Sequence, residues 1–209
     1  MRPALLLLFA SCATGFGESA GGTVEIVVGG APADVGGLEL QMAYLGIGEI
    51  ELPAAEQEEP PDDGHGHAHL RAALSLPASI DLLGAPQHLR TRRLPAAHYE
   101  SAHVALEAID GCMLELVGKL DERPLRVCLE DGEHLELPLE LDVEHGERVE
   151  LHLEVALRRI MEVLKSAQLQ PDADGVLRVD GAHDRNTGAL LRQALREAIA
   201  AEVHEHAGH

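Results

Sequence analysis

Two segments of this chain are rich in histidine, the side chain that transition metals bind most often in proteins. They hold six of the thirteen histidines, which are His65, His67, His69, His204, His206 and His209. In an extended backbone, residues two positions apart point to the same side, so the first three imidazoles can converge on one zinc or copper ion. Asp62 and Asp63 add negative charge beside that triplet.

Three interpretations of these histidines stay open: a physiological metal site that binds or buffers metal, weak surface chelation without function, and solvated polarity. The triplet lies in residues 53–69, an acidic segment without apolar periodicity that indicates a solvated loop. A further cation motif, Asp172-Ala173-Asp174-Gly175, resembles part of a calcium loop. Gln170 and Gly181 stand where such a loop needs carboxylates, so a turn is expected instead.

Cys112 and Cys128 are the second candidate for chemistry. They flank a segment that we expect to turn near Leu120, which would place them opposite each other across a hairpin, at a distance that suits a disulfide. The alternative is two independent, half-buried thiols. A metal pair is disfavoured because no CxxC spacing is present.

Several function classes lose support from composition. The net charge of −20 disfavours binding to nucleic acid, and the chain has no tryptophan and only two tyrosines for stacking on sugars or bases. No nucleophile elbow, phosphate loop or dinucleotide fingerprint is present, so we expect no enzyme, with an unidentified hydrolase as an alternative. The remaining strand histidines (His98, His103, His134, His145 and His152) are expected to lie on the surface.

The sequence pattern predicts that β-strands position most of these candidate residues. Strict alternation of apolar and polar residues marks 38–52, 99–108, 134–143 and 149–157 as half-buried strands, and Asp131-Gly132 indicates a hairpin turn. From Arg158 onward the apolar spacing becomes helical. The expected fold is therefore mainly β, an antiparallel β-sandwich over 23–157 with a helical C-terminal extension over 158–209.

The N-terminus reads as an export signal. Arg2 precedes the apolar run 4–10, and Phe9-Ala10-Ser11-Cys12 resembles the lipobox of bacterial lipoproteins, although that family usually has Leu in place of Phe9. The resemblance implies a signal peptide over 1–11 and a lipid on Cys12. The small, Gly-rich and polar residues that follow predict a flexible tether over 12–22. Ordinary cleavage near Ala13 or Gly15 is the alternative, and it also gives an exported protein.

The order of features from Thr23 to Leu157 is similar to a family of secreted bacterial and archaeal proteins, a domain of unknown function thought to be an immunoglobulin-like or transthyretin-like sandwich. The resemblance rests on strand 23–28, the turn 31–35, the segments 80–83 and 94–99, and the later acidic strands. It covers about residues 22–157 and implies export and a sandwich. It supplies no catalytic residues.

These observations predict an exported, lipid-anchored protein of the cell envelope, at the periplasmic face or outer membrane of a Gram-negative bacterium. It would act as a non-enzymatic structural or interaction module. Its expected partners are the membrane, through the lipid, and an unidentified envelope protein. No cofactor is required by this prediction, and zinc or copper is the ion that the alternative, metal binding or buffering, would use.

Overall fold

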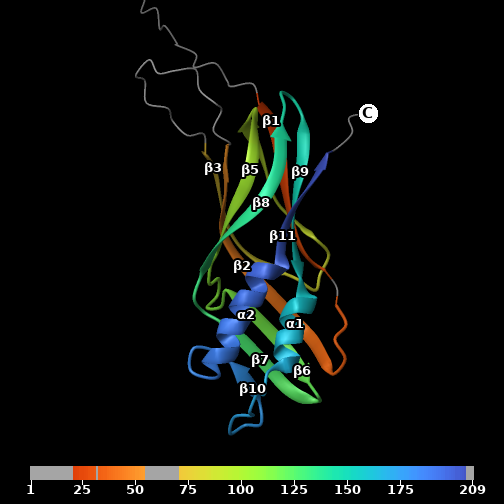
Figure 1. Cartoon of the computed structure of the whole chain (residues 1–209), viewed down its shortest axis with the longest axis vertical. Helices are drawn as coiled ribbons and strands as arrows, with labels where there is room; N and C mark the ends of the chain where they lie inside the picture. The colour runs from red at the N-terminus through yellow and green to blue at the C-terminus, as the bar shows by residue number, and fades with distance from the viewer. Residues whose placement is uncertain (1–20, 32, 55–70, 206–209) are drawn as a thin grey trace, which may run out of the picture.

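The structure is a computed structural model that describes residues 21–31, 33–54 and 71–205, and strands dominate it (Figure 1). In chain order its elements are β1 (Gly21–Ala31), β2 (Leu38–Pro53), β3 (Arg71–Asp81), β4 (Gln87–Pro95), β5 (Ala97–Leu106), β6 (Leu114–Leu120), β7 (Arg123–Leu129), β8 (Glu133–Val143), β9 (Arg148–Ala156), α1 (Leu157–Ser166), β10 (Leu177–Val179), α2 (Arg185–Ala198) and β11 (Ile199–Glu205).

The long strand β2 is the spine of the larger, seven-stranded sheet. It pairs antiparallel with β6 along 38–45 and with β5 along 47–51, while β3 pairs with 44–53. β8 then pairs with β5, and β7 pairs with β6. The sheet is therefore long. We call the half with β3, β5 and β8 the strand end, and the half with β6, β7 and β10 the helical end (Figure 1).

The smaller sheet has four strands in the order β11-β9-β1-β4, and it packs against the larger sheet at the strand end. Both sheets turn alternate apolar residues into one shared core. In β8 and β9 the inward side chains are Leu135, Leu137, Leu139, Leu141, Val143, Val149, Leu151, Leu153 and Val155. The polar residues between them face outward, which is where any site on these strands must lie.

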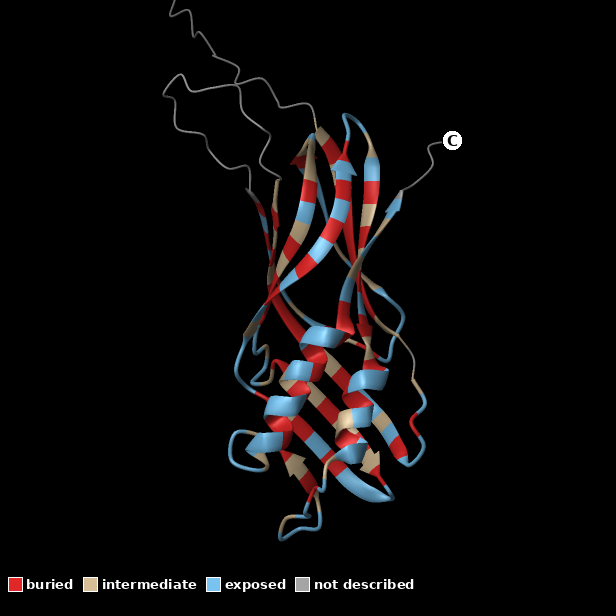
Figure 2. Ribbon diagram, viewed as in Figure 1, coloured by how far each residue is buried: buried red, intermediate tan, exposed pale blue. Residues whose placement is uncertain are grey.

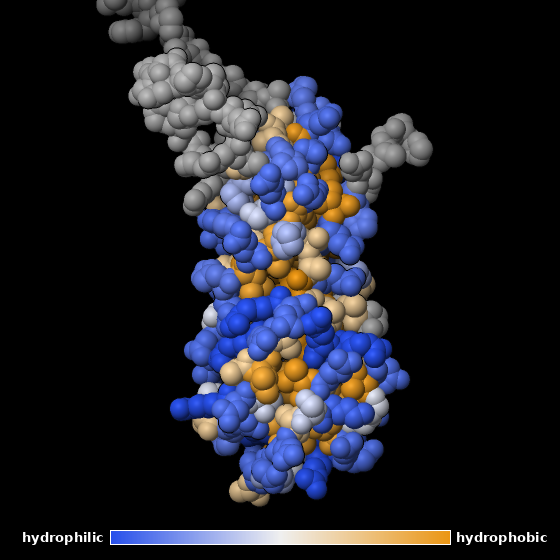
Figure 3. Space-filling model, in the orientation of Figure 1, coloured by the Kyte–Doolittle hydropathy of each residue, from blue (hydrophilic) through white to orange (hydrophobic). Residues whose placement is uncertain are grey.

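At the helical end, α1 and α2 lie side by side over one face of the larger sheet (Figure 1). Figure 2 shows the buried stripe of each helix turned toward that sheet. The side chain of Asp184 caps α2 by accepting a hydrogen bond of 3.1 Å from the backbone N–H of Thr187. Figure 3 shows mostly hydrophilic residues on the visible surface along β8 and around the helices, with apolar patches between them.

The mainly β fold is confirmed, and two parts of the expected architecture are wrong. The sheets are mixed and not purely antiparallel, because β1 pairs in parallel with β9 and β10 pairs in parallel with β7. The region after Arg158 is not only helical, because β10 and β11 alternate with the two helices and join the sheets. Ile199 adopts extended backbone directly after α2, so the chain passes from helix to strand without a loop.

The hairpin expected at Asp131-Gly132 is also wrong. β7 and β8 follow one another across Asp131-Gly132, but β7 pairs with β6 and β10 while β8 pairs with β5. β8 and β9 are joined by a short turn, yet β9 pairs with β1 and β11 in the other sheet. The turn residues and the apolar alternation are compatible with both connections. They determine that the chain reverses and which face of each strand is buried, but they do not determine which strand becomes the neighbour.

No helix among the described residues is long and apolar enough to cross a membrane.

Candidate functional site

An open depression of about 380 Å³ lies on the outer face of the larger sheet, at the strand end. We call it the acidic hollow, and its ionisable lining consists of Glu49, Glu51, His103, His134 and Glu136. The strand register sets Glu51, His103 and Glu136 in one row across β2, β5 and β8. In the next row Ala105 lies between Glu49 and His134, and its small methyl group leaves the centre open.

Alternation along each strand explains why these side chains face outward. Ile50 is fully buried at 0% exposure, so the glutamates before and after it must point to the other face of the sheet. Leu135 is buried in the same way between His134 and Glu136. The hollow thus follows from the apolar residues that build the core beneath it.

The ionisable groups of the acidic hollow have no partners in the described part of the chain. None of the three carboxylates or two imidazoles makes a hydrogen bond or ion pair there. Glu49 and Glu51 lie two residues apart on β2, and Glu136 lies across β5 from them, so these like charges repel one another at a cost in stability. Unfavourable placement of this kind is typical of positions kept for binding. The hollow therefore concentrates uncompensated negative charge.

His98 shows what the same surface looks like when the charges are paired. Its Nδ1 lies 2.7 Å from Oδ1 of Asp142, and its Nε2 lies 3.7 Å from Glu140 and 3.8 Å from Glu100. The hydrogen bond with Asp142 is the main cause that raises the pKa of His98, and the two glutamates raise it further. β5 and β8 contain no lysine or arginine, so carboxylates and imidazoles are the only ionisable side chains on their outer face.

The outer face of the smaller sheet carries a second group of histidines. His152 of β9 and His204 of β11 contact each other edge to face, with ring centroids 4.4 Å apart. Nε2 of His152 contacts Oε1 of Glu150, and Nε2 of His204 lies 3.9 Å from Oε2 of Glu202. The register places Glu150 opposite His204 and Glu202 opposite His152, so the four residues alternate on the two strands.

Glu25 of β1 lies on the same outer face and is the most buried carboxylate in the described residues, at 7% exposure. It forms an ion pair with Arg148 of β9, and Oε2 lies 3.4 Å from Nε2 of His88 of β4. A buried carboxylate needs such partners, because desolvation penalises an unpaired charge. Glu25 therefore has a structural role within the sheet.

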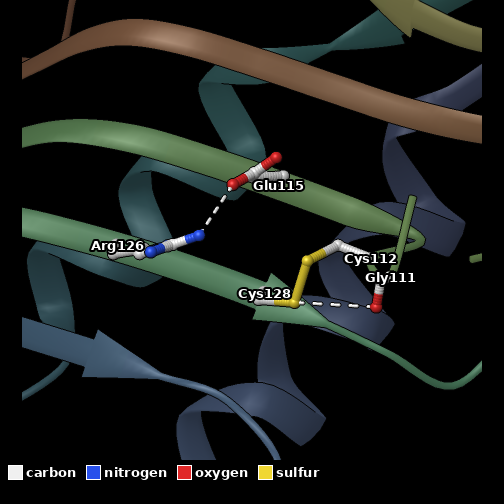
Figure 4. The surroundings of a disulfide bond; sticks show 5 residues. All are labelled: Gly111, Cys112, Glu115, Arg126 and Cys128. Atoms are coloured by element: carbon white, nitrogen blue, oxygen red, sulfur yellow. Dashed lines mark hydrogen bonds and ion pairs between the residues drawn. A yellow bond between two sulfur atoms is a disulfide. The ribbon is translucent and has the colours of Figure 1, made fainter. Parts of the chain in front are cut away.

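The disulfide between Cys112 and Cys128 is present, with the two Cα atoms 5.4 Å apart (Figure 4). The expected geometry is wrong, because the residue opposite Cys128 is Glu115 and not Cys112. The hairpin turns at Asp121 and Glu122, and Cys112 precedes β6 in the segment that leads from β5. The pair lies half exposed at the end of β7, and Cys128 shares a small pocket with the charged residues Arg126, Glu130, Arg178 and Asp180.

Most of the site residues expected from the sequence lie outside the described residues: Cys12, His65, His67, His69, His206 and His209. Only His204 of the two histidine segments is described, and its neighbour is His152, which the sequence assigned to the plain surface. Within residues 21–31, 33–54 and 71–205, no three His, Cys, Asp or Glu side chains are arranged to hold a metal ion.

The segment at Asp172 is a turn, as expected. Oδ1 of Asp172 accepts hydrogen bonds from the backbone N–H groups of Asp174 and Val176, and Gly175 takes a positive φ of 79°. Oδ2 bonds Arg178, and this bond is the main cause that lowers the pKa of Asp172. Both oxygens are thus occupied by the protein itself.

The acidic hollow was not expected from the sequence. A signal existed in the outward Glu-x-Glu of β2 and His-x-Glu of β8, but β2, β5 and β8 come from parts of the chain that are about 30 to 50 residues apart, and only the strand order brings them together. Comparison with known proteins found no matching family model, no related curated protein and no similar solved structure.

Proposed function

We propose that this chain is an exported, lipid-anchored envelope protein that acts as a non-enzymatic interaction module, and that the acidic hollow holds a lysine or arginine side chain of its partner. One observation carries the proposal: three carboxylates and two imidazoles line an open depression without any partner in the described residues. A cationic side chain supplies the compensating charge that the described residues lack there.

Charge complementarity argues for this occupant. A guanidinium or ammonium group can donate hydrogen bonds to two carboxylates at once, and such charge-assisted bonds are among the strongest in proteins. Glu51 and Glu136 stand on either side of His103, so a cation above that imidazole would lie between two acceptors. Complementary charge also speeds encounter and selects the partner.

The setting of the module is supported by other features. A disulfide fits an oxidising compartment, as in the periplasm or outside the cell. The lipobox-like segment at Cys12 gives a route to the membrane through covalent lipid, which a chain of net charge −20 needs because anionic bilayers repel it. The resemblance of this domain to an immunoglobulin-like or transthyretin-like family is also part of the proposal.

Calorimetry with a synthetic oligolysine peptide tests the hollow directly. Wild-type protein should bind the peptide with an affinity that falls as salt is added, and a peptide with acetylated lysines should not bind. A triple variant, Glu49→Gln, Glu51→Gln and Glu136→Gln, should lose this binding.

The matched control removes the same charge elsewhere, with Glu39→Gln, Glu130→Gln and Glu154→Gln on other parts of the surface. It should bind oligolysine nearly as wild type does. If both triple variants lose affinity equally, general negative charge attracts the peptide and the hollow is not the recognition site.

A further inference from the structure

We propose that His152 and His204 form a binding site for one divalent transition metal ion, such as zinc, on the outer face of the smaller sheet. This site goes beyond the proposed function and does not rest on it. The two residues lie on the adjacent strands β9 and β11, diagonal to each other in the register. Their side chains already meet, with ring centroids 4.4 Å apart and ring planes at 64°.

The spacing of the two rings is close to that of a ligated pair. With metal–nitrogen bonds of about 2.1 Å and a tetrahedral angle, two imidazole centroids on one zinc ion lie roughly 5 Å apart. The observed 4.4 Å differs from this by less than the width of an atom. Small rotations of the two side chains would therefore turn the ring contact into shared coordination, with no movement of the strands.

Neighbouring carboxylates suit this arrangement. A histidine that binds a metal usually pairs its other ring nitrogen with a carboxylate, which fixes the tautomer and makes the ligand more basic. His152 has such a partner, because its Nε2 contacts Oε1 of Glu150. Nε2 of His204 lies 3.9 Å from Glu202. If these pairings persist, Nδ1 of each ring is the nitrogen left for the metal.

The charge around the pair also favours a cation. Arg148, the positive group closest along β9, forms an ion pair with Glu25, so its charge is already balanced. Because no three ligands converge in the described residues, the site consists of two imidazoles, and water completes the coordination shell. Such a site binds less tightly than a structural zinc centre, which has four protein ligands.

Calorimetric titration of the full chain with zinc tests the site, in a background where the other candidate histidines cannot contribute. That background replaces His65, His67, His69, His206 and His209 by Ala. It should still bind one zinc ion per chain. Adding His152→Ala or His204→Ala should weaken binding by about a hundredfold, and Glu150→Gln should weaken it by roughly tenfold.

The matched control is His145→Ala, an exposed histidine in the turn between β8 and β9, which should leave zinc binding unchanged. Thermal unfolding without metal checks that each variant folds. If His152→Ala does not fold, His152→Gln and the zinc-induced shifts of the imidazole NMR signals decide instead. The proposal is overturned if the background does not bind zinc, or if its binding depends on neither imidazole or on only one of them.

Discussion

Cys128 is bonded to Cys112, although the residue opposite it on the neighbouring strand is Glu115. Cys112 belongs to the segment in which the chain leaves β5 and returns to start β6. Next to it, the backbone N–H of Met113 donates a hydrogen bond of 2.6 Å to the carbonyl of Leu129, and the Met113 side chain is fully buried. The disulfide therefore ties this segment to the end of β7.

Replacing both cysteines by serine should lower the free energy of unfolding by about 3 kcal/mol, because a crosslink over a short loop restricts the unfolded chain. Urea denaturation monitored by circular dichroism measures the change. Thiol titration of the denatured, unreduced wild type should find neither cysteine reactive. Two reactive thiols in that titration would show that the bond does not form in the protein.

Replacing Cys12 by Ser should release the protein from the membrane, because the lipid is the only anchor that we propose and two or more acyl chains are needed for stable attachment. Membrane fractionation and metabolic labelling with a fatty acid measure the effect. The variant with both Cys112 and Cys128 replaced is the control and should stay in the membrane fraction. Unchanged fractionation and labelling of Cys12→Ser would contradict the lipoprotein hypothesis.

The alternation of apolar and polar residues correctly predicted which face of each of these strands is buried. The alternation in 134–143 and 149–157 correctly identified which side chains enter the core, because burying one face of a strand requires that period. The same pattern could not tell which strand lies beside which. A strand with one apolar face packs equally well in an antiparallel hairpin or across to another sheet, as β8 and β9 do.

The sequence analysis predicted neither strand β11 nor the contact between His152 and His204, and the two omissions have related causes. Ile199, Ala201 and Val203 alternate as a strand should, but they follow a strong helical pattern without Gly or Pro, and alanine favours helix. Without β11, His204 had no known neighbour, so the proximity of His152 was not predictable. The acidic hollow likewise depends on long-range pairing that local spacing does not encode.

Arg148→Ala should destabilise the protein by roughly 1 to 3 kcal/mol, because it removes the main partner of the buried carboxylate of Glu25. Arg126→Ala is a matched control, since Arg126 pairs at 3.4 Å with Glu115 on a more exposed part of the sheet, and it should cost less than about 1 kcal/mol. Chemical denaturation measures both variants.

Adding Glu25→Gln to Arg148→Ala tests the cause of this loss. A neutral amide is cheaper to bury than an unpaired carboxylate, so the double variant should recover part of the lost stability. If the double variant is less stable than Arg148→Ala alone, the loss comes from packing of the arginine side chain and not from the buried charge.

His98 should make stability depend on pH. Its pKa is raised in the folded protein, chiefly by the hydrogen bond with Asp142, so protonation is tighter in the folded than in the unfolded chain. The stabilising contribution is then fully present below the unfolded pKa and is lost as pH rises through the folded pKa. His98→Asn should accordingly lower the melting temperature at about pH 5.5 and have a smaller effect at about pH 8.5.

The control for this prediction is His145→Asn, which removes an exposed imidazole with no ion-pair partner in the described residues. It should change the melting temperature similarly at both pH values. Asp142→Asn should act like His98→Asn, because it removes the main cause of the raised pKa while keeping the imidazole.

An NMR titration gives the direct measurement: the pKa of His98 should lie above that of a histidine in a model peptide and should fall in Asp142→Asn. A value that does not move in this variant would mean that Glu100 and Glu140 govern the protonation of His98, which would contradict the order of causes given above.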